Sequence, residues 1–133
     1  MTSQHLILAA ESWSKFSLEE QLGNIGSEVS RAIRSKGDAE YYWGAVSRAL
    51  DLFFLTIKDP RWKGRLKEIV RTKELFCAAA LGSNEFKTTL EDLDRYFTYF
   101  ALVARARKRF YGNNVMSTTS PTRGEACEET NKP

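Results

Sequence analysis

Residues that begin and end helices recur along this chain and divide most of it into four segments. Ser17 and Glu20 have the spacing of a capping box, in which each side chain accepts a backbone N–H of the other residue. Asp38 is a second helix cap, and Asp59 followed by Pro60 is a third, because proline fits the first turn of a helix. We expect the fourth helix to open at TTLE, residues 88–91.

Glycines follow three of these segments, and glycine readily adopts the backbone conformation that ends a helix. The expected helices cover residues 17–37, 38–58, 59–82 and 88–112. A chain of 133 residues fits one domain. We predict an all-α fold: an antiparallel four-helix bundle over residues 17–112, a short N-terminal arm over 1–16 and a disordered C-terminal tail over 113–133, where periodic apolar residues stop.

Apolar residues in the first expected helix are spaced four and three apart, which is typical of one buried face. The neighbouring strip contains Gly23, Gly26 and Ser30. A glycine inside a helix costs up to about 1 kcal/mol relative to alanine, so a compensating contact is expected. Close approach of another helix is one explanation, and a backbone contact with a phosphate or other ligand is the alternative.

The tetrapeptide VSRA occurs twice, at residues 29–32 and 46–49. In both helices the valine lies in the buried face, and the arginine, Arg31 or Arg48, points away from it. The repeat therefore indicates two helices with the same packing phase and with solvated arginines. A ligand-binding arginine pair is the alternative.

The second and fourth expected helices carry more apolar surface than one core requires. Tyr41, Leu52 and Leu55 lie on the same side of the second helix as Arg48, away from its main apolar stripe. Contiguous exposed apolar patches usually mark a partner surface. We therefore predict a homo-oligomer, or a protein partner, whose interface includes Tyr41, Arg48, Leu52 and Leu55. The alternative is that the N-terminal arm, through Trp13 among others, covers this surface.

Basic residues concentrate in the third helix and at the end of the fourth. Residues 60–83 contain six basic and two acidic residues, although the net charge of the chain is only +3. A basic stripe that neutralises phosphates is typical of nucleic-acid binding, and a solvated basic face is the alternative. The predicted RNA- or DNA-binding residues are Arg61, Arg65, Lys67, Arg71, Arg105, Lys108 and Arg109.

Lys73 has a helical angle inside the apolar stripe of the third helix, between Ile69 and Phe76. A lysine there either extends its ammonium to the edge of the bundle, pairs with a carboxylate, or takes part in binding or chemistry. The first two interpretations are structural and are the ones we predict.

Residue groups typical of catalysis are missing from the sequence. The sole histidine, His5, has no cysteine or second histidine near it, and no phosphate-binding glycine motif is present. We therefore predict no enzyme activity, no catalytic residue, no cofactor and no metal site. Cys77 and Cys127 lack CxxC spacing, which fits a reduced compartment. Because no apolar stretch reaches the roughly 20 residues of a membrane span, we predict a cytoplasmic protein without membrane association.

Three stretches carry a resemblance to known proteins: SLEEQLGNIGSEVSRAI, LTIKDPRWKGRLKEIVRTKELFC and LDRYFTYFALVARARK. Together, over about residues 14–109, they resemble a family of small, uncharacterised prokaryotic helical proteins with LxxQLxNxGSEVxRA and DPRWxGRLKE blocks. That resemblance implies no activity. In architecture alone, the chain is also similar to two groups of small basic four-helix proteins. One is encoded in insertions of bacterial large-subunit ribosomal RNA genes, and the other comprises the accessory variability determinants of diversity-generating retroelements.

The accessory variability determinants are pentameric and bind nucleic acid and a reverse transcriptase, so this similarity implies an oligomer with both kinds of partner. We expect a non-catalytic helical-bundle oligomer that presents a basic face to RNA or DNA, as an accessory to a nucleic-acid enzyme such as a reverse transcriptase. A protein-binding scaffold without nucleic-acid activity is the alternative. An enzyme that uses Lys73 with a neighbouring carboxylate is the third reading.

Overall fold

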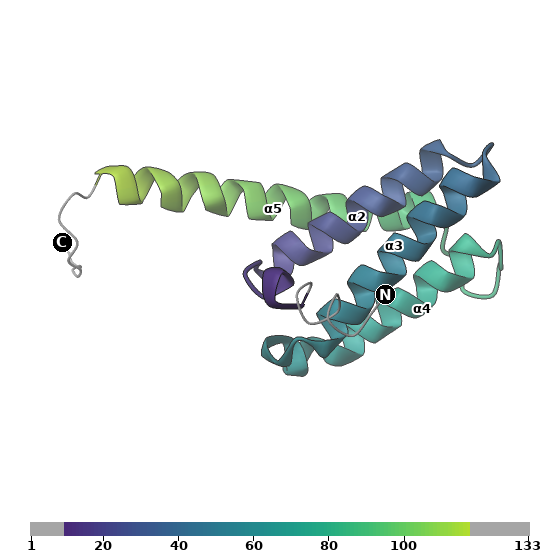
Figure 1. Cartoon of the computed structure of the whole chain (residues 1–133), viewed down its shortest axis with the longest axis horizontal. Coiled ribbons are helices and arrows are strands. Elements are labelled where there is room, and N and C mark those ends of the chain that lie inside the picture. The colour runs from purple at the N-terminus through teal and green to yellow at the C-terminus, as the bar shows by residue number, and fades with distance from the viewer. Residues whose placement is uncertain (1–9, 118–133) are drawn as a thin grey trace.

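The computed structural model describes the backbone of residues 10–117 and the side chains of residues 10–110 (Figure 1). A helical turn at residues 10–13 precedes the main elements. These are α2 (Leu18–Arg34), α3 (Ala39–Lys58), the 3-10 helix η1 (Pro60–Arg65), α4 (Leu66–Ala80) and α5 (Leu90–Ser117). The predicted all-α class is confirmed, since the described residues are helical or lie in connecting turns and contain no strand.

The predicted caps begin the helices as expected. The backbone N–H of Glu20 donates to Ser17 Oγ at 3.2 Å, and that of Ser17 donates to Glu20 Oε1 at 2.9 Å. Asp38 caps α3 through its side chain. At the start of α5, Thr89 and Asp92 form a second reciprocal pair, with bonds of 3.0 and 3.1 Å. Each cap satisfies N–H groups that the first turn of a helix leaves unbonded.

Two helix boundaries differ from the prediction. The third helix begins as η1, and Trp62, with φ −103° and ψ 21°, interrupts the helical backbone before α4. The tighter turn lets Arg61 and Trp62 bond to other parts of the fold. At the far end, α5 continues past Gly112 to Ser117, because a glycine weakens a helix without preventing it. Residues 118–133 of the predicted tail and residues 1–9 of the predicted arm lie outside the described residues.

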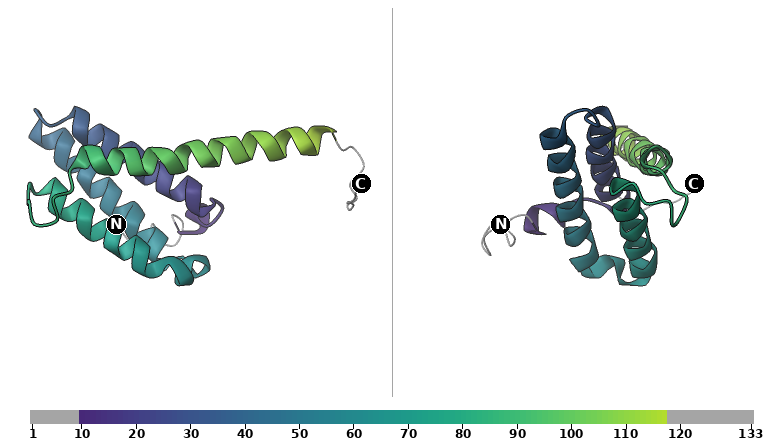
Figure 2. Two further views of the ribbon diagram at one scale, coloured as in Figure 1. Left: turned by 180° about the vertical axis from the view of Figure 1, so that it is seen from behind. Right: turned by 90° about the vertical axis from the view of Figure 1, so that its right-hand side faces the viewer.

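The helices pack around a single core, with one of them extending away. α3 and α4 run side by side, and α2 contacts both α3 and α5 (Figures 1 and 2). α5 passes the start of α2, so its C-terminal part projects beyond the other helices. At 1.5 Å per residue, the 28 residues of α5 span about 42 Å.

Phe53 of α3 lies at the centre of the core. Its ring centroid is 5.7 Å from that of Phe76 in α4 and 5.9 Å from that of Phe97 in α5, so one side chain joins three helices. α2 contributes Ile25 and Val29, and all five side chains are fully buried. Close packing of these groups sets the spacing between the helices.

α2 and α5 approach each other closely at the predicted glycine strip. A Cβ atom at Gly26 would lie 2.5 Å from Cβ of Phe97, and one at Gly23 would lie 3.1 Å from Cα of Ala101. Carbon atoms in contact are normally about 3.5–4.0 Å apart, so a side chain at Gly26 would push the helices apart. The close-approach interpretation of the strip is therefore confirmed.

Replacing Gly26 by alanine should lower the free energy of unfolding by about 1–3 kcal/mol, because the added methyl group overpacks the contact with Phe97. Urea unfolding of the two proteins measures this. Gly64→Ala is the matched control, since a Cβ there meets nothing within 4 Å, and its stability should be unchanged or slightly raised. Equal losses in both variants would contradict the interpretation.

Candidate functional site

Gln21 of α2 is fully buried and bonds to three other parts of the chain. Its Nε2 donates to the carbonyl oxygen of Trp13 at 3.0 Å and to Oδ2 of Asp59 at 3.1 Å. Its Oε1 accepts the indole N–H of Trp62 at 2.9 Å. Trp13 in turn donates its indole N–H to Oγ1 of Thr56 at 3.0 Å. This network fastens the segment before α2, and η1, to the rest of the fold.

Arg61, the first predicted nucleic-acid-binding residue, belongs to this network. Its Nη2 donates to Oδ2 of Asp59 at 2.7 Å and to the Phe16 carbonyl at 2.8 Å, and the guanidinium lies 4.4 Å from the ring centroid of Trp62. Hydrogen bonding from Arg61 lowers the pKa of Asp59 from 3.8 to about 2, although burial opposes the change. The interruption at Trp62 also removes Arg61 from the outer face of α4, where it was predicted to lie, so that placement is corrected.

The next three predicted residues lie exposed around the start of α4. Arg65 pairs with Glu68 at 2.9 Å, and Arg71 lies 3.8 Å from Glu74. Lys67 forms no ion pair within the described part of the chain. Exposed pairs of this kind contribute about 0–1 kcal/mol, so they do not prevent these side chains from exchanging a carboxylate for a phosphate.

The last turns with described side chains in α5 carry the remaining predicted residues, all of them exposed: Arg105, Lys108 and Arg109. Lys108 Nζ lies 3.9 Å from Glu20 of α2. Arg107, which was not among the predicted residues, lies 3.1 Å from Glu19. A hollow of about 340 Å³ at the boundary between α2 and α5 is lined in part by Arg105 and Lys108.

Glu19 relates the two sets of basic residues. It pairs with Arg107 of α5. The pKa of Arg65 in η1 is raised chiefly by the hydrogen bond to Glu68, and the charge of Glu19 contributes to the same rise. Arg65 and Arg107, which are about forty residues apart in sequence, therefore both interact with the Glu19 carboxylate at the start of α2.

The two VSRA arginines, which were predicted to be solvated, bind the same carboxylate. Arg31 Nη1 lies 2.8 Å from Oε2 of Glu28, and Arg48 Nε lies 3.1 Å from its Oε1. The Glu28 side chain is only 11% exposed, whereas both arginine side chains are more than half exposed. The repeat thus combines a shared packing phase with an ion pair that links α2 to α3. Sequence spacing gave no sign of this, because Glu28 and Arg48 lie in different helices.

The residues of the predicted oligomer interface do not form one exposed patch. Leu55 is 7% exposed and Leu52 packs against the core, while Arg48 is held in the ion pair just described. Trp13 is itself buried and bonds to the last turns of α3, as the alternative of a covering arm expects. Tyr41 alone of the predicted apolar residues stays largely exposed, at 68%. The correction arises because α3 packs on several sides rather than along one stripe.

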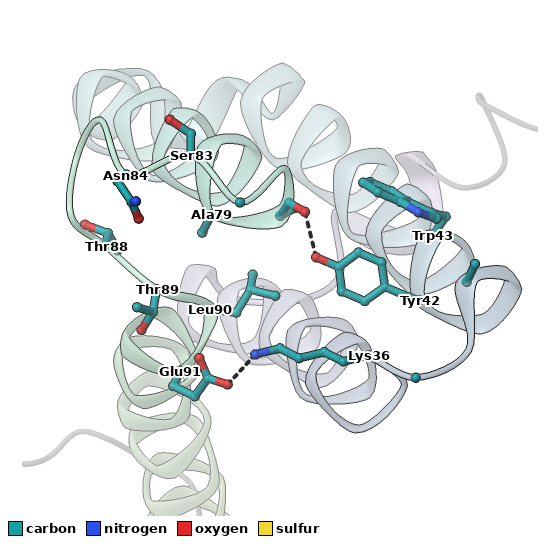
Figure 3. Close-up of a pocket in the computed structure, with 14 residues that line it drawn as sticks. Lys36, Tyr42, Trp43, Ala79, Ser83, Asn84, Thr88, Thr89, Leu90 and Glu91 are labelled. Carbon is teal, nitrogen blue, oxygen red and sulfur yellow. Dashed lines mark hydrogen bonds and ion pairs between the residues drawn. The ribbon is translucent and has the colours of Figure 1, made fainter.

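A pocket of about 600 Å³, which the sequence analysis did not predict, lies at the opposite end of the fold from the projecting part of α5 (Figure 3). It forms where the turn between α2 and α3, the first turns of α3, the loop after α4 and the start of α5 meet. Tyr42 donates its hydroxyl to the Ala80 carbonyl at 2.7 Å, and burial raises the pKa of this hydroxyl. Lys36 Nζ lies 2.7 Å from Oε2 of Glu91.

Gly82 shapes one side of this pocket. Its φ of 78° is in the left-handed region, and its N–H donates to the Ala79 carbonyl at 3.1 Å. The N–H of Ser83 donates to the Ala78 carbonyl at 2.9 Å, which completes a Schellman motif at the end of α4. The turn brings Ser83 and Asn84 to the pocket lining. The glycine was recognised from the sequence as a helix end, but no motif signals the pocket.

Lys73 is partly buried on α4 and forms no ion pair among the described residues. No group of three or more His, Cys, Asp or Glu side chains in the described part of the chain could hold a metal ion, and His5 lies outside that part. None of the described helices is long and apolar enough to cross a membrane.

No family model, curated protein or solved structure matches this chain. The resemblances given above therefore stay predictions.

Asp59→Asn should lower the free energy of unfolding by about 2 kcal/mol at pH 7, because the ionised carboxylate is the form that Arg61 stabilises. Because the pKa of Asp59 is lower in the folded state, its ionised carboxylate stabilises the fold at pH values above the ordinary pKa of 3.8. This stabilisation is lost as the pH falls toward about 2. The difference from the wild type should be about half as large at pH 3. Urea unfolding at pH 7 and pH 3 measures it.

Asp51→Asn is the control for this measurement, since Asp51 is exposed on α3 and its replacement should change stability little at either pH. A loss for Asp59→Asn that did not depend on pH would show that the charge of Asp59 contributes nothing to the fold.

Proposed function

We propose that this chain is a non-catalytic antiparallel four-helix bundle protein that binds RNA or DNA through phosphate contacts, as an accessory to a nucleic-acid enzyme. The binding surface consists of two groups of residues. The η1–α4 basic group is Lys63, Arg65, Lys67 and Arg71, and the α5 basic group is Arg105, Arg107, Lys108 and Arg109. The proposal rests above all on the α5 basic group, whose residues lie exposed where α5 passes the start of α2.

Electrostatics favour contacts along the outward side of α5. Glu19 and Glu20 at the start of α2 would repel a phosphate that approached between the helices, and they pair there with Arg107 and Lys108. Arg105 and Arg109 have no such partner within the described residues and are exposed. Each phosphate contact releases counterions from the nucleic acid, so several weak contacts act together and weaken as salt rises.

Sequence preference is expected to be low. Lysine and arginine on exposed helix turns contact phosphates, which are the same at every position of a nucleic acid, whereas sequence is read at base edges. The η1–α4 basic group would add phosphate contacts to a nucleic-acid strand that passes the start of α2. The proposed activity is therefore general binding that holds a nucleic acid for another protein.

Charge reversal at Arg105 and Arg109 together should weaken binding to a duplex DNA and to a structured RNA by similar factors. The slope of log affinity against log salt should also fall by about 0.7 to 0.9 per contact removed. Fluorescence anisotropy at two salt concentrations measures both quantities. The matched control reverses Arg34 and Lys87, which are exposed outside both basic groups and carry the same total charge. No affinity at low salt, or equal losses in the two double variants, would exclude the proposed surface.

A protein partner or a second copy of the chain is the second candidate function, and α5 also favours it. Tyr99 is 63% exposed and Leu102 is 54% exposed. Both lie on the side of α5 opposite its buried residues Leu93 and Phe97. Exposed apolar side chains that gather on one helix side are typical of a protein interface. The expected homo-oligomer is therefore better assigned to this side of α5 than to the side of α3 on which Leu55 is buried.

Tyr99→Ser combined with Leu102→Ser should reduce the mass measured by light scattering, while helicity stays the same, because both side chains are exposed. Tyr41→Ser tests the interface predicted on α3 and should leave the mass unchanged. If the wild-type chain is already a monomer at high concentration, self-association through α5 is excluded and a different protein partner would be required.

A further inference from the structure

We propose that the pocket between the α2–α3 turn and the α4–α5 loop binds a small organic molecule with no net charge, which carries a flat ring system and several hydrogen-bonding groups. Nucleosides and free aromatic amino acids share this chemistry. The site is formed by residues outside both basic groups, at the opposite end of the fold (Figures 1 and 3). The proposal therefore stands independently of nucleic-acid binding.

The size of the pocket and its aromatic side fit such a ligand. A volume of about 600 Å³ lies within the range of about 300–1,000 Å³ that small-molecule sites usually have. The rings of Tyr42 and Trp43 line it and stand nearly perpendicular, at 88°, with centroids 4.9 Å apart. Trp43 is 46% exposed although it is apolar, so a flat ligand ring would remove part of the indole from water.

The polar side of the pocket offers hydrogen-bonding groups that the protein does not use itself. Asn84 carries two donors and an acceptor, and its side chain has no hydrogen bond within the described residues. Figure 3 shows it on the loop across the pocket from Tyr42. The indole N–H of Trp43 has no acceptor in the same part of the chain. These groups can therefore bond to a ligand without breaking an existing protein bond.

The charges in the pocket favour a ligand without net charge. Lys36 and Glu91 are the charged residues among those that line it, and they neutralise each other at 2.7 Å. A phosphate near Lys36 would also meet Glu91. The helix ends around the pocket oppose one another, because the ends of α2 and α4 carry negative dipole charge and the starts of α3 and α5 carry positive dipole charge. The ammonium and carboxylate of an amino acid can instead pair with Glu91 and Lys36. The hydroxyls of a nucleoside can bond to the same two groups.

Isothermal titration of the full chain tests this proposal with two sets of probes. One set is adenosine, guanosine and cytidine, and the other is L-tryptophan and L-tyrosine. At least one probe should bind with a Kd below about 1 mM, and the set to which it belongs identifies the ligand class. The matched anions AMP, GMP and CMP should bind at least about tenfold more weakly than their nucleosides. N-acetyl-L-tryptophan, which lacks the ammonium, should likewise bind more weakly than L-tryptophan.

Two variants then locate the binding. Trp43→Ala and Asn84→Ala should each raise the Kd about tenfold or more, through loss of ring contact and of hydrogen bonds. Both residues are exposed, so circular dichroism should show that the fold is retained. Phe54→Ala removes an aromatic ring that is 44% exposed on α3 and does not line the pocket, so it should leave the Kd unchanged. The proposal is overturned if no probe binds at about 1 mM, if the anions bind as tightly as the neutral probes, or if both pocket variants bind like the wild type.

Discussion

The buried side-chain amide of Gln21 is the interaction on which the positions of the segment before α2 and of η1 depend. It bonds to the Trp13 carbonyl, the Asp59 carboxylate and the Trp62 indole. A buried polar group that loses its partner costs about 1–3 kcal/mol, so these elements are fixed together. Gln21 lies in the stretch LEEQL, and Asp59 and Trp62 lie in DPRW, so these residues have a structural role in the fold.

The arginines with a structural role differ from those available for binding in the burial of the carboxylate with which they pair. Asp59 and Glu28 have side chains that are 5% and 11% exposed, so the arginines that bind them stabilise a charge shielded from water. Arg65 pairs instead with a carboxylate that is 42% exposed, and solvent screening makes such a pair weak. Arg61, Arg31 and Arg48 thus belong to the fold, and the surface proposed for phosphate binding uses other side chains.

Both proposed sites depend on the length and position of α5. Its first turn supplies Leu90 and Glu91 to the pocket, and its later turns hold the α5 basic group beside the start of α2. The contact of Phe97 with Gly26 holds the middle of the helix against α2. The close helix spacing at the glycines therefore helps to position α5, which carries residues of both proposed sites.

The sequence by itself determined the all-α class, the helix starts at Ser17, at Asp38 and within TTLE, residues 88–91, and the concentration of basic residues. It also predicted the close contact at Gly26, with a ligand contact as the alternative. Caps and helical periodicity act over a few neighbouring residues, so they can be read locally. Only the tertiary structure decided that Arg61 and Arg48 bind buried carboxylates, that Leu55 is covered and that a pocket forms around Tyr42 and Asn84. These features require contacts between residues far apart in the chain. The non-helical backbone at Trp62 also changed the direction of the Arg61 side chain from the one that a regular α-helix had predicted.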